Sequence, residues 1–167
     1  MVQEEMIKGR IAEAIVKCMF EDLGFEVIPY GYEHTCPTIA KKERLIKGDV
    51  KNHIRKAPDF IIIDKEGEAN FVEVKFRADG NYKREADYPY RDCYIILLTE
   101  KYLGIEQYKN LNDTTKMDGD NFSAIHLNDK KASFKSLMSV PLLSKLDSES
   151  KKIVLDYRNL LIKYMNN

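Results

Sequence analysis

Three residues whose types suit phosphoryl chemistry lie on two short apolar segments in the middle of the chain. Asp59 opens the segment 59–63, and Glu73 and Lys75 lie within the segment 71–77. Two carboxylates beside a lysine can hold a hard divalent cation such as Mg²⁺ and add a positive charge next to it. Thirteen residues separate Asp59 from Glu73, so this chemistry requires the two segments to fold against each other.

The residues between the two segments predict a β-hairpin. The sequence Lys65-Glu66-Gly67 fits a three-residue loop in which a type I turn is followed by a left-handed glycine. Counted outward from that loop, Asp59 pairs with Glu73. Paired residues point to one face and side chains alternate along a strand, so Asp59, Glu73 and Lys75 share a face. The opposite face then presents the core residues Phe60, Val72, Val74 and Phe76.

Two carboxylates held this close repel each other and require protonation, a cation or solvent. A bound divalent metal can polarise a phosphoryl oxygen and lower the pKa of a water, while the lysine ammonium orients that water or stabilises the transition state. The pattern therefore predicts metal-dependent hydrolysis of a phosphodiester. The alternative interpretation is an exposed strand face with alternating charges and no affinity for a divalent ion.

Composition excludes several classes of protein. The 167 residues suffice for one globular domain, and 27 Lys and Arg balance 27 Asp and Glu, so a nucleic-acid surface has to come from local clustering. Three scattered cysteines without CxxC spacing argue against disulfides and structural zinc, and His34, Cys36 and His53 form no metal-binding spacing. Without an apolar run of about 18 residues or a signal peptide, we expect a cytoplasmic protein that does not bind membranes.

The remaining patterns predict a mixed α/β domain over 1–167. Helices are expected over 4–23 (ended by Gly24), in the loop 78–92, over 103–111 and over 148–165, and strands over 25–28, 93–99 and 122–127. The first helix has an apolar stripe through Ile7, Ile11, Ala14, Ile15, Cys18 and Met19. Glu13 lies off that stripe, beside Gly9, Val16 and Phe20, on a face that is turned either toward the site or toward solvent. The last helix is expected to dock through Ile153, Val154, Leu160, Leu161 and Tyr164.

A basic cluster precedes the hairpin. Residues 41–56 contain seven Lys or Arg against two acidic residues, a local charge of +5. Phosphates are contacted mostly by such cations, and tyrosines 82, 88 and 90 could stack on unpaired bases. The alternative is a solvated loop. The predicted nucleic-acid contacts are Lys51, Arg55, Lys56, Arg77, Lys83 and Arg84.

These residues resemble the PD-(D/E)XK nuclease superfamily, which has the restriction-endonuclease-like fold. The matching elements are Pro58-Asp59 and Glu73-Val74-Lys75 on consecutive strands. The segments Gly9-Arg10-Ile11-Ala12-Glu13 and Leu23-Gly24-Phe25-Glu26-Val27 are similar to the first helix and strand of archaeal-type Holliday-junction resolvases. The resemblance covers about residues 5–100.

The resemblance implies a restriction-endonuclease-like core, a mixed sheet with an antiparallel motif hairpin flanked by helices. It implies Mg²⁺ or Mn²⁺ held by Asp59, Glu73 and the Val74 carbonyl, a catalytic Lys75 and an accessory Glu13. It further implies an endonuclease acting on DNA, structure-specific or of restriction or repair type, with a homodimer expected by analogy. Two alternatives remain: a catalytically silent nucleic-acid-binding or assembly module of this fold, and a structural protein with a polar hairpin face.

Overall fold

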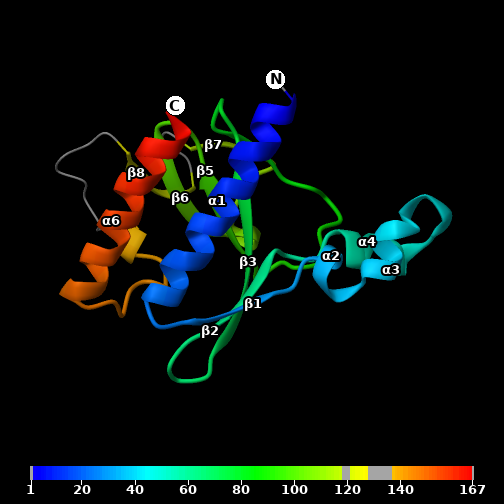
Figure 1. Cartoon of the computed structure of the whole chain (residues 1–167), viewed down its shortest axis with the longest axis horizontal. Helices are drawn as coiled ribbons and strands as arrows, with labels where there is room; N and C mark the ends of the chain where they lie inside the picture. The colour runs from blue at the N-terminus through cyan, green and yellow to red at the C-terminus, as the bar shows by residue number, and fades with distance from the viewer. Residues whose placement is uncertain (1, 118–120, 128–136, 167) are drawn as a thin grey trace.

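The computed structural model describes residues 2–117, 121–127 and 137–166, and these form an α/β structure around a mixed six-stranded sheet (Figure 1). The strand order is β1-β2-β3-β5-β6-β8, and only the β3–β5 pair is parallel. A separate two-stranded sheet pairs β4 with β7. The strands are β1 (Glu26–Pro29), β2 (Phe60–Ile63), β3 (Ala69–Phe76), β4 (Asn81–Lys83), β5 (Tyr94–Leu98), β6 (Tyr102–Gln107), β7 (Thr114–Lys116) and β8 (Ser123–His126).

The β2–β3 hairpin has the predicted closure and register. Phe60 pairs with Val72 and Ile63 with Ala69, so the same register extended by one residue sets Asp59 opposite Glu73. Gly67 has a φ of 85°, as the left-handed position of the loop requires. The Asp64 carboxylate accepts the N–H groups of residues 66 and 68 at 2.9 and 2.8 Å and thereby stabilises the turn.

The first helix, α1 (Val2–Asp22), ends as the sequence predicts. Gly24 has a φ of 87°, its N–H donates to Glu21 O, and the Phe25 N–H donates to Phe20 O, both at 3.0 Å. These two bonds are a Schellman motif, and the accompanying apolar contact is the edge-to-face pair of Phe20 and Phe25, with ring centroids 5.3 Å apart. The chain therefore turns sharply from α1 into β1.

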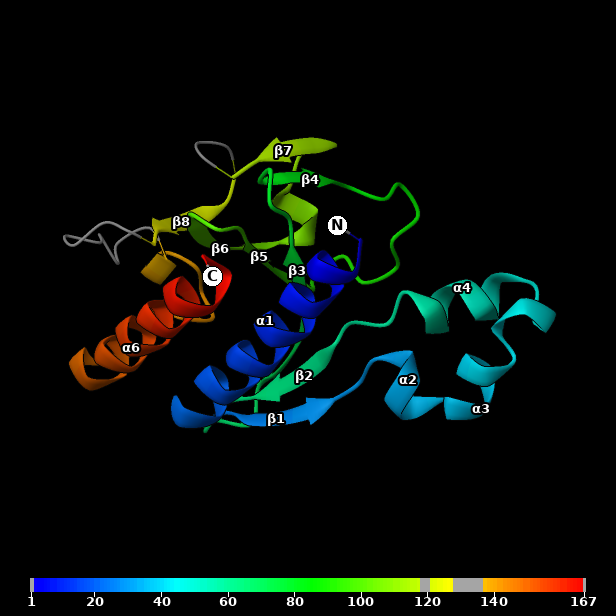
Figure 2. The same cartoon turned by 45° about the horizontal axis from the view of Figure 1, so that its top comes forward.

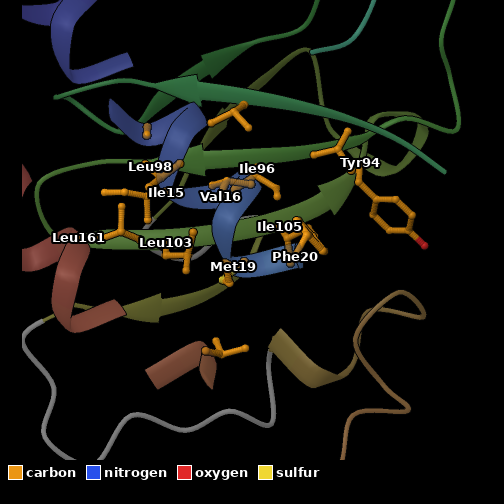
Figure 3. Packing of buried hydrophobic residues seen from close by; sticks show 14 of the residues in the cluster. Ile15, Val16, Met19, Phe20, Tyr94, Ile96, Leu98, Leu103, Ile105 and Leu161 are labelled. Carbon is orange, nitrogen blue, oxygen red and sulfur yellow. The ribbon is translucent and has the colours of Figure 1, made fainter. Parts of the chain in front are cut away.

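The face that α1 buries differs from the predicted stripe. Ile7 is 57% exposed, and Ala14 and Cys18 are exposed as well. The buried residues are Ala12, Ile15, Val16, Met19, Phe20 and Leu23. The predicted stripe was right for Ile15 and Met19, which are buried, and for Ile11, which is partly buried, and it was wrong for Ile7, Ala14 and Cys18. The buried face also includes Val16 and Phe20, which pack with residues of β5 and β6 (Figure 3).

Two helices predicted from local pattern are strands in the structure. Residues 102–107 form β6, which pairs antiparallel with β5 and buries Leu103 and Ile105 in the core. Gly104 lies between them, and a Cβ there would collide with the Met117 side chain. The short helix expected within 78–92 is replaced by β4. In both places strand pairing overrides a local helical preference.

The last helix, α6 (Ser148–Met165), packs against α1 on the same face of the sheet (Figures 1 and 2). Val154 and Leu161 are buried as predicted, whereas Tyr164 is 45% exposed and Met165 is buried in its place. Arg158 also lies in the buried stripe, where its Nε and Nη2 donate to Leu127 O at 3.0 and 2.8 Å. The opposite face of the sheet carries a second, smaller core with Cys93, Ile95, Leu97 and Tyr108.

Between β1 and β2 the chain forms an arm that projects from one end of the sheet (Figure 2). It consists of α2 (Tyr32–Thr35), α3 (Pro37–Lys41), the 3₁₀ turn Glu43–Leu45 and α4 (Asp49–Arg55). None of the three α-helices buries a residue, and Leu45 and Val50 are 81% and 72% exposed. The basic cluster predicted over 41–56 thus lies on a projection of the fold.

Within the described part of the chain, no helix has the length and apolarity that crossing a membrane requires.

Candidate active site

Asp59 is fixed at the point where the β2–β3 ladder ends. The register sets Pro58 opposite Val74, and proline has no N–H to donate to the Val74 carbonyl, so the regular ladder ends here. The Asp59 side chain fills the gap, since its Oδ2 accepts the Val74 N–H at 2.7 Å. Because the N–H and C=O of one strand residue point to the same neighbouring strand, the Val74 carbonyl also faces this gap. An aspartate carboxylate and a backbone carbonyl thus face the same gap.

Glu73 and Lys75 lie on the face of β3 that packs against the second core. Glu73 is only 8% exposed. Its Oε1 is paired with Lys75 Nζ, whereas its Oε2 is buried and has no hydrogen-bond partner among the described residues. An orphaned buried carboxylate oxygen is costly unless a cation or a donor reaches it.

The electrostatics of the site keep its carboxyl groups poised for protonation. Burial, followed by repulsion from Asp59, raises the pKa of Glu73 to about 7. Burial also raises the pKa of Asp59, although the Val74 N–H and Lys75 oppose that rise. Burial lowers the pKa of Lys75, but Glu73 and Asp59 raise it by more, so the lysine is a cation. A cation close to these groups would favour their ionised forms.

Glu13 projects from α1 toward this cluster. Two of the neighbours that the sequence set beside it, Val16 and Phe20, are buried, so this helix face packs on the sheet and is not a solvent face. Glu13 itself is half-buried. Burial, followed by repulsion from Asp59 and Glu33, raises its pKa to about 7. The structure therefore brings Glu13 within electrostatic reach of Asp59 and Lys75.

The oxygen groups of the site suit a hard cation with an incomplete protein shell. Among the residues that the structure describes, no three His, Cys, Asp or Glu side chains are grouped closely enough to hold a metal by themselves. Mg²⁺ does not need such a cage, because it is usually bound by one or two carboxylates while waters and substrate phosphates complete its shell. Asp59, Glu73 with its orphaned Oε2, and the Val74 carbonyl fit that pattern.

The six predicted nucleic-acid contacts fall into different environments. Arg77 and Lys83 are exposed, while Lys51 and Arg55 lie on α4. Arg77 Nη1 also donates to Phe76 O at 2.9 Å. The other two are bound to more distant parts of the chain. Lys56 Nζ pairs with Asp87 at 2.6 Å and Glu85 at 3.2 Å, and Arg84 donates to Leu111 O at 3.0 Å and lies over the Tyr108 ring.

Two residues of α2 adjoin the site although the sequence pattern did not single them out as functional. Glu33 raises the pKa of Asp59 and His34 lowers it, so both lie within electrostatic reach of that carboxylate. They lie there because the Tyr30 N–H donates to Asp59 O at 2.8 Å, which starts α2 beside Asp59. The pairing of β1 with β2 was the missing signal, since without it residues 30–34 have no assigned neighbour.

A cavity of about 330 Å³ adjoins the same site. Glu73 and Lys75 form part of its wall, and its other walls come from the end of α4 and from the segment that follows β4. The full lining is Asn52, Arg55, Lys56, Ala57, Glu73, Lys75, Tyr82, Glu85, Tyr88 and Tyr108. A molecule in this cavity would therefore touch two of the three candidate catalytic residues.

A second cavity, of about 320 Å³, lies at the turn end of the hairpin. Two of the carboxylates that line it already have structural roles. Asp64 stabilises the hairpin turn, and Asp147 caps α6 by accepting the Ser150 N–H at 2.8 Å. The cavity beside Glu73 is therefore the one that the candidate chemistry concerns.

No family model, no curated protein and no solved structure matches this chain.

Proposed function

We propose that this chain is a metal-dependent deoxyribonuclease with a restriction-endonuclease-like core of the PD-(D/E)XK type. One observation carries the proposal: Asp59, the Val74 carbonyl and the orphaned Oε2 of Glu73 gather at the end of one hairpin, beside a lysine. The basic arm next to this site supports DNA as the substrate, because a local charge of +5 in a neutral chain attracts a polyanion.

In the proposed reaction a water attacks phosphorus, and the phosphodiester bond opposite the water breaks. When bound, Mg²⁺ or Mn²⁺ would supply Lewis-acid polarisation of a phosphoryl oxygen and favour ionisation of the water. Asp59, Glu73 and the Val74 carbonyl would hold it. A 5′-phosphate and a 3′-hydroxyl are the products that the family resemblance implies.

The remaining steps belong to Lys75 and Glu13. Lys75 is an ammonium with a raised pKa, so it stabilises charge that develops on the phosphoryl oxygens and orients the water; it does not act as the base. Glu13 lies within electrostatic reach of Asp59 and Lys75, and in its ionised form, which a bound cation favours, it would accept the water's proton.

A cleavage assay with and without Mg²⁺ tests the proposal. We expect Asp59→Ala, Glu73→Ala and Lys75→Ala each to abolish Mg²⁺-dependent cleavage while the proteins remain folded by circular dichroism. The panel should contain branched, duplex and single-stranded DNA, with Mn²⁺ as a second metal. Undiminished cleavage in all three variants would refute the proposal.

A catalytically silent DNA-binding module is the second candidate. It is favoured by the direct ion pair between Lys75 and Glu73, which occupies one carboxylate oxygen, and by the lack of a three-residue ligand group in the described part of the chain. Tight DNA binding without hydrolysis across the whole panel of substrates and metals would favour this candidate over the nuclease.

A further inference from the structure

The cavity beside Glu73 gives a substrate group access to the Glu73 carboxylate. The access is from the face of the sheet that carries the second, smaller core. Glu73 is almost fully buried, yet it contributes to the cavity wall together with Lys75. Its unpartnered Oε2 is a buried acceptor next to this space. With about 330 Å³ the cavity is in the size range of small-molecule sites, far too small for a base pair with its stacked neighbours.

Three tyrosines give the cavity aromatic walls. Tyr82 and Tyr108 are buried, whereas Tyr88, which also lines the cavity, is only half-buried. The Tyr88 ring is braced by Tyr108, with centroids 4.5 Å apart, and by Tyr90 at 5.7 Å. Its hydroxyl is buried near the Cys93 thiol and makes no regular hydrogen bond within the described residues. A rigid, half-buried ring of this kind is a platform on which one nucleobase can stack.

The polar residues of the cavity suit the rest of a nucleotide. Asn52, exposed on α4, has an amide that can donate to and accept from the edge of a base. Arg55 and Lys75 line the cavity and supply positive charge for a phosphate, while Lys56 is already paired with Asp87 and Glu85.

The α4 wall is fastened to the segment 85–90. Lys56 bridges to Asp87 and Glu85, and the Tyr90 hydroxyl donates to His53 O at 3.3 Å. These bonds hold the end of α4 against the segment 85–90, so the cavity is a recess of about 330 Å³ between them and the sheet. A nucleotide held in a duplex by pairing and stacking does not fit such a recess, whereas a nucleotide without a partner does.

We propose that this cavity accepts one unpaired nucleotide of DNA, stacked on Tyr88 with its phosphate beside Lys75. The inference rests on the proposed function and narrows its substrate to DNA that has an unpaired nucleotide at the cleaved position. The basic arm then holds the flanking duplex through its phosphates.

Binding without divalent metal tests this proposal separately from catalysis. The probe is a DNA duplex with one unpaired 2-aminopurine, a fluorescent adenine analogue, and its reference is the fully paired duplex of the same sequence, both in EDTA. We expect about tenfold tighter binding of the probe and a change of its fluorescence as the base leaves the helix for an aromatic platform.

Two cavity variants and one matched control test whether the preference for the unpaired base arises in this cavity. Tyr88→Leu keeps apolar bulk but removes the stacking face, and Asn52→Ala removes a polar contact from an exposed position. Each should reduce the preference for the unpaired base severalfold, and Tyr88→Leu should also reduce the fluorescence change. Tyr164→Leu changes an exposed tyrosine on α6, at the opposite face of the sheet, and should leave both readouts unchanged. If Tyr88→Leu does not fold, the binding preference of Asn52→Ala still tests the proposal.

Three outcomes would overturn the inference. The protein could bind the two duplexes with equal affinity, both folded cavity variants could keep the preference for the unpaired base, or the RNA version of the probe could bind more tightly than the DNA probe. Mg²⁺-dependent cleavage of both duplexes at equal rates would also overturn it while leaving the proposed nuclease intact. Preferential binding of the unpaired base without any cleavage would support the inference and refute the nuclease.

Discussion

The Val74 N–H donates to Asp59 Oδ2 at 2.7 Å, in the place where a continuing strand would have accepted it. Pro58 has no N–H to donate to the Val74 carbonyl, and the Val74 N–H is bound by the side chain of the following aspartate. The hydrogen bond does two things. It satisfies a buried backbone donor, and it holds the carboxylate beside Val74 of β3.

The two roles of Asp59 can be separated by substitution. Asp59→Asn keeps an acceptor for the Val74 N–H, so we expect its free energy of unfolding to stay within about 1 kcal/mol of that of the natural protein. Asp59→Ala leaves that donor without a partner, so we expect its free energy of unfolding to fall by about 1–3 kcal/mol. Both variants should lose Mg²⁺-dependent cleavage by about 100-fold or more, because the ligand charge is gone. Urea unfolding and a cleavage time course measure the two effects. Equal destabilisation by Asn and Ala would contradict a structural role for the hydrogen bond.

The raised carboxyl pKa values predict how stability depends on pH. Glu13 and Glu73 have pKa values of about 7 in the folded protein, against an ordinary value of 4.5. The folded state therefore binds more protons between pH 4.5 and 7, and stability falls as pH rises through this range. In EDTA we expect the melting temperature to decrease from pH 5 to pH 8 by about 3 °C or more.

Two comparisons make this prediction specific. The Glu73→Gln variant should show a flatter profile than the natural protein, since one of the two groups no longer titrates. Mg²⁺ should raise the melting temperature more at pH 8 than at pH 6, because protons and the cation compete for the same oxygens. A melting temperature that rises steadily from pH 5 to pH 8, with no response to Mg²⁺, would count against a poised carboxyl cluster.

Glu13 should matter to the rate of cleavage although it is remote in sequence from the hairpin. Glu13→Gln removes the proposed proton acceptor, so we expect the rate to fall by about 100-fold and the pH–rate profile to lose the rise, on the acidic side of pH 7, that ionisation of Glu13 produces. Glu5→Gln, at an exposed position of the same helix, is the matched control and should behave as the natural protein. Full activity of Glu13→Gln would mean that this face of α1 only packs against the sheet.

The basic arm should govern the salt dependence of DNA binding. Lys41→Gln/Lys42→Gln removes two exposed charges from the arm, and Lys151→Gln/Lys152→Gln removes two exposed charges from α6. If both arm lysines contact phosphates, the slope of log affinity against log salt decreases by up to about 0.9 for each. The α6 variant should keep the natural slope. Identical slopes in the two double variants would mean that the arm takes no part in DNA binding.

The sequence alone determined the hairpin. Its loop chemistry, the glycine at the left-handed position and the alternation of apolar residues are local features, so Asp59 could be paired with Glu73 before any coordinates. The end of α1 at Gly24 and the span of α6 were predictable for the same reason, because capping and helical period act within a few residues.

Only the tertiary structure decided which surfaces meet at the site. The face of α1 that carries Glu13, the approach of α2 to Asp59 and the cavity beside Glu73 all depend on contacts between distant segments. The segment 102–107 became a strand because β5 offered it a partner, against a local pattern that favoured a helix. Side-chain alternation and turn residues are set over a few positions of the chain, whereas burial is set by whichever element packs opposite, and that information is spread over the whole sequence.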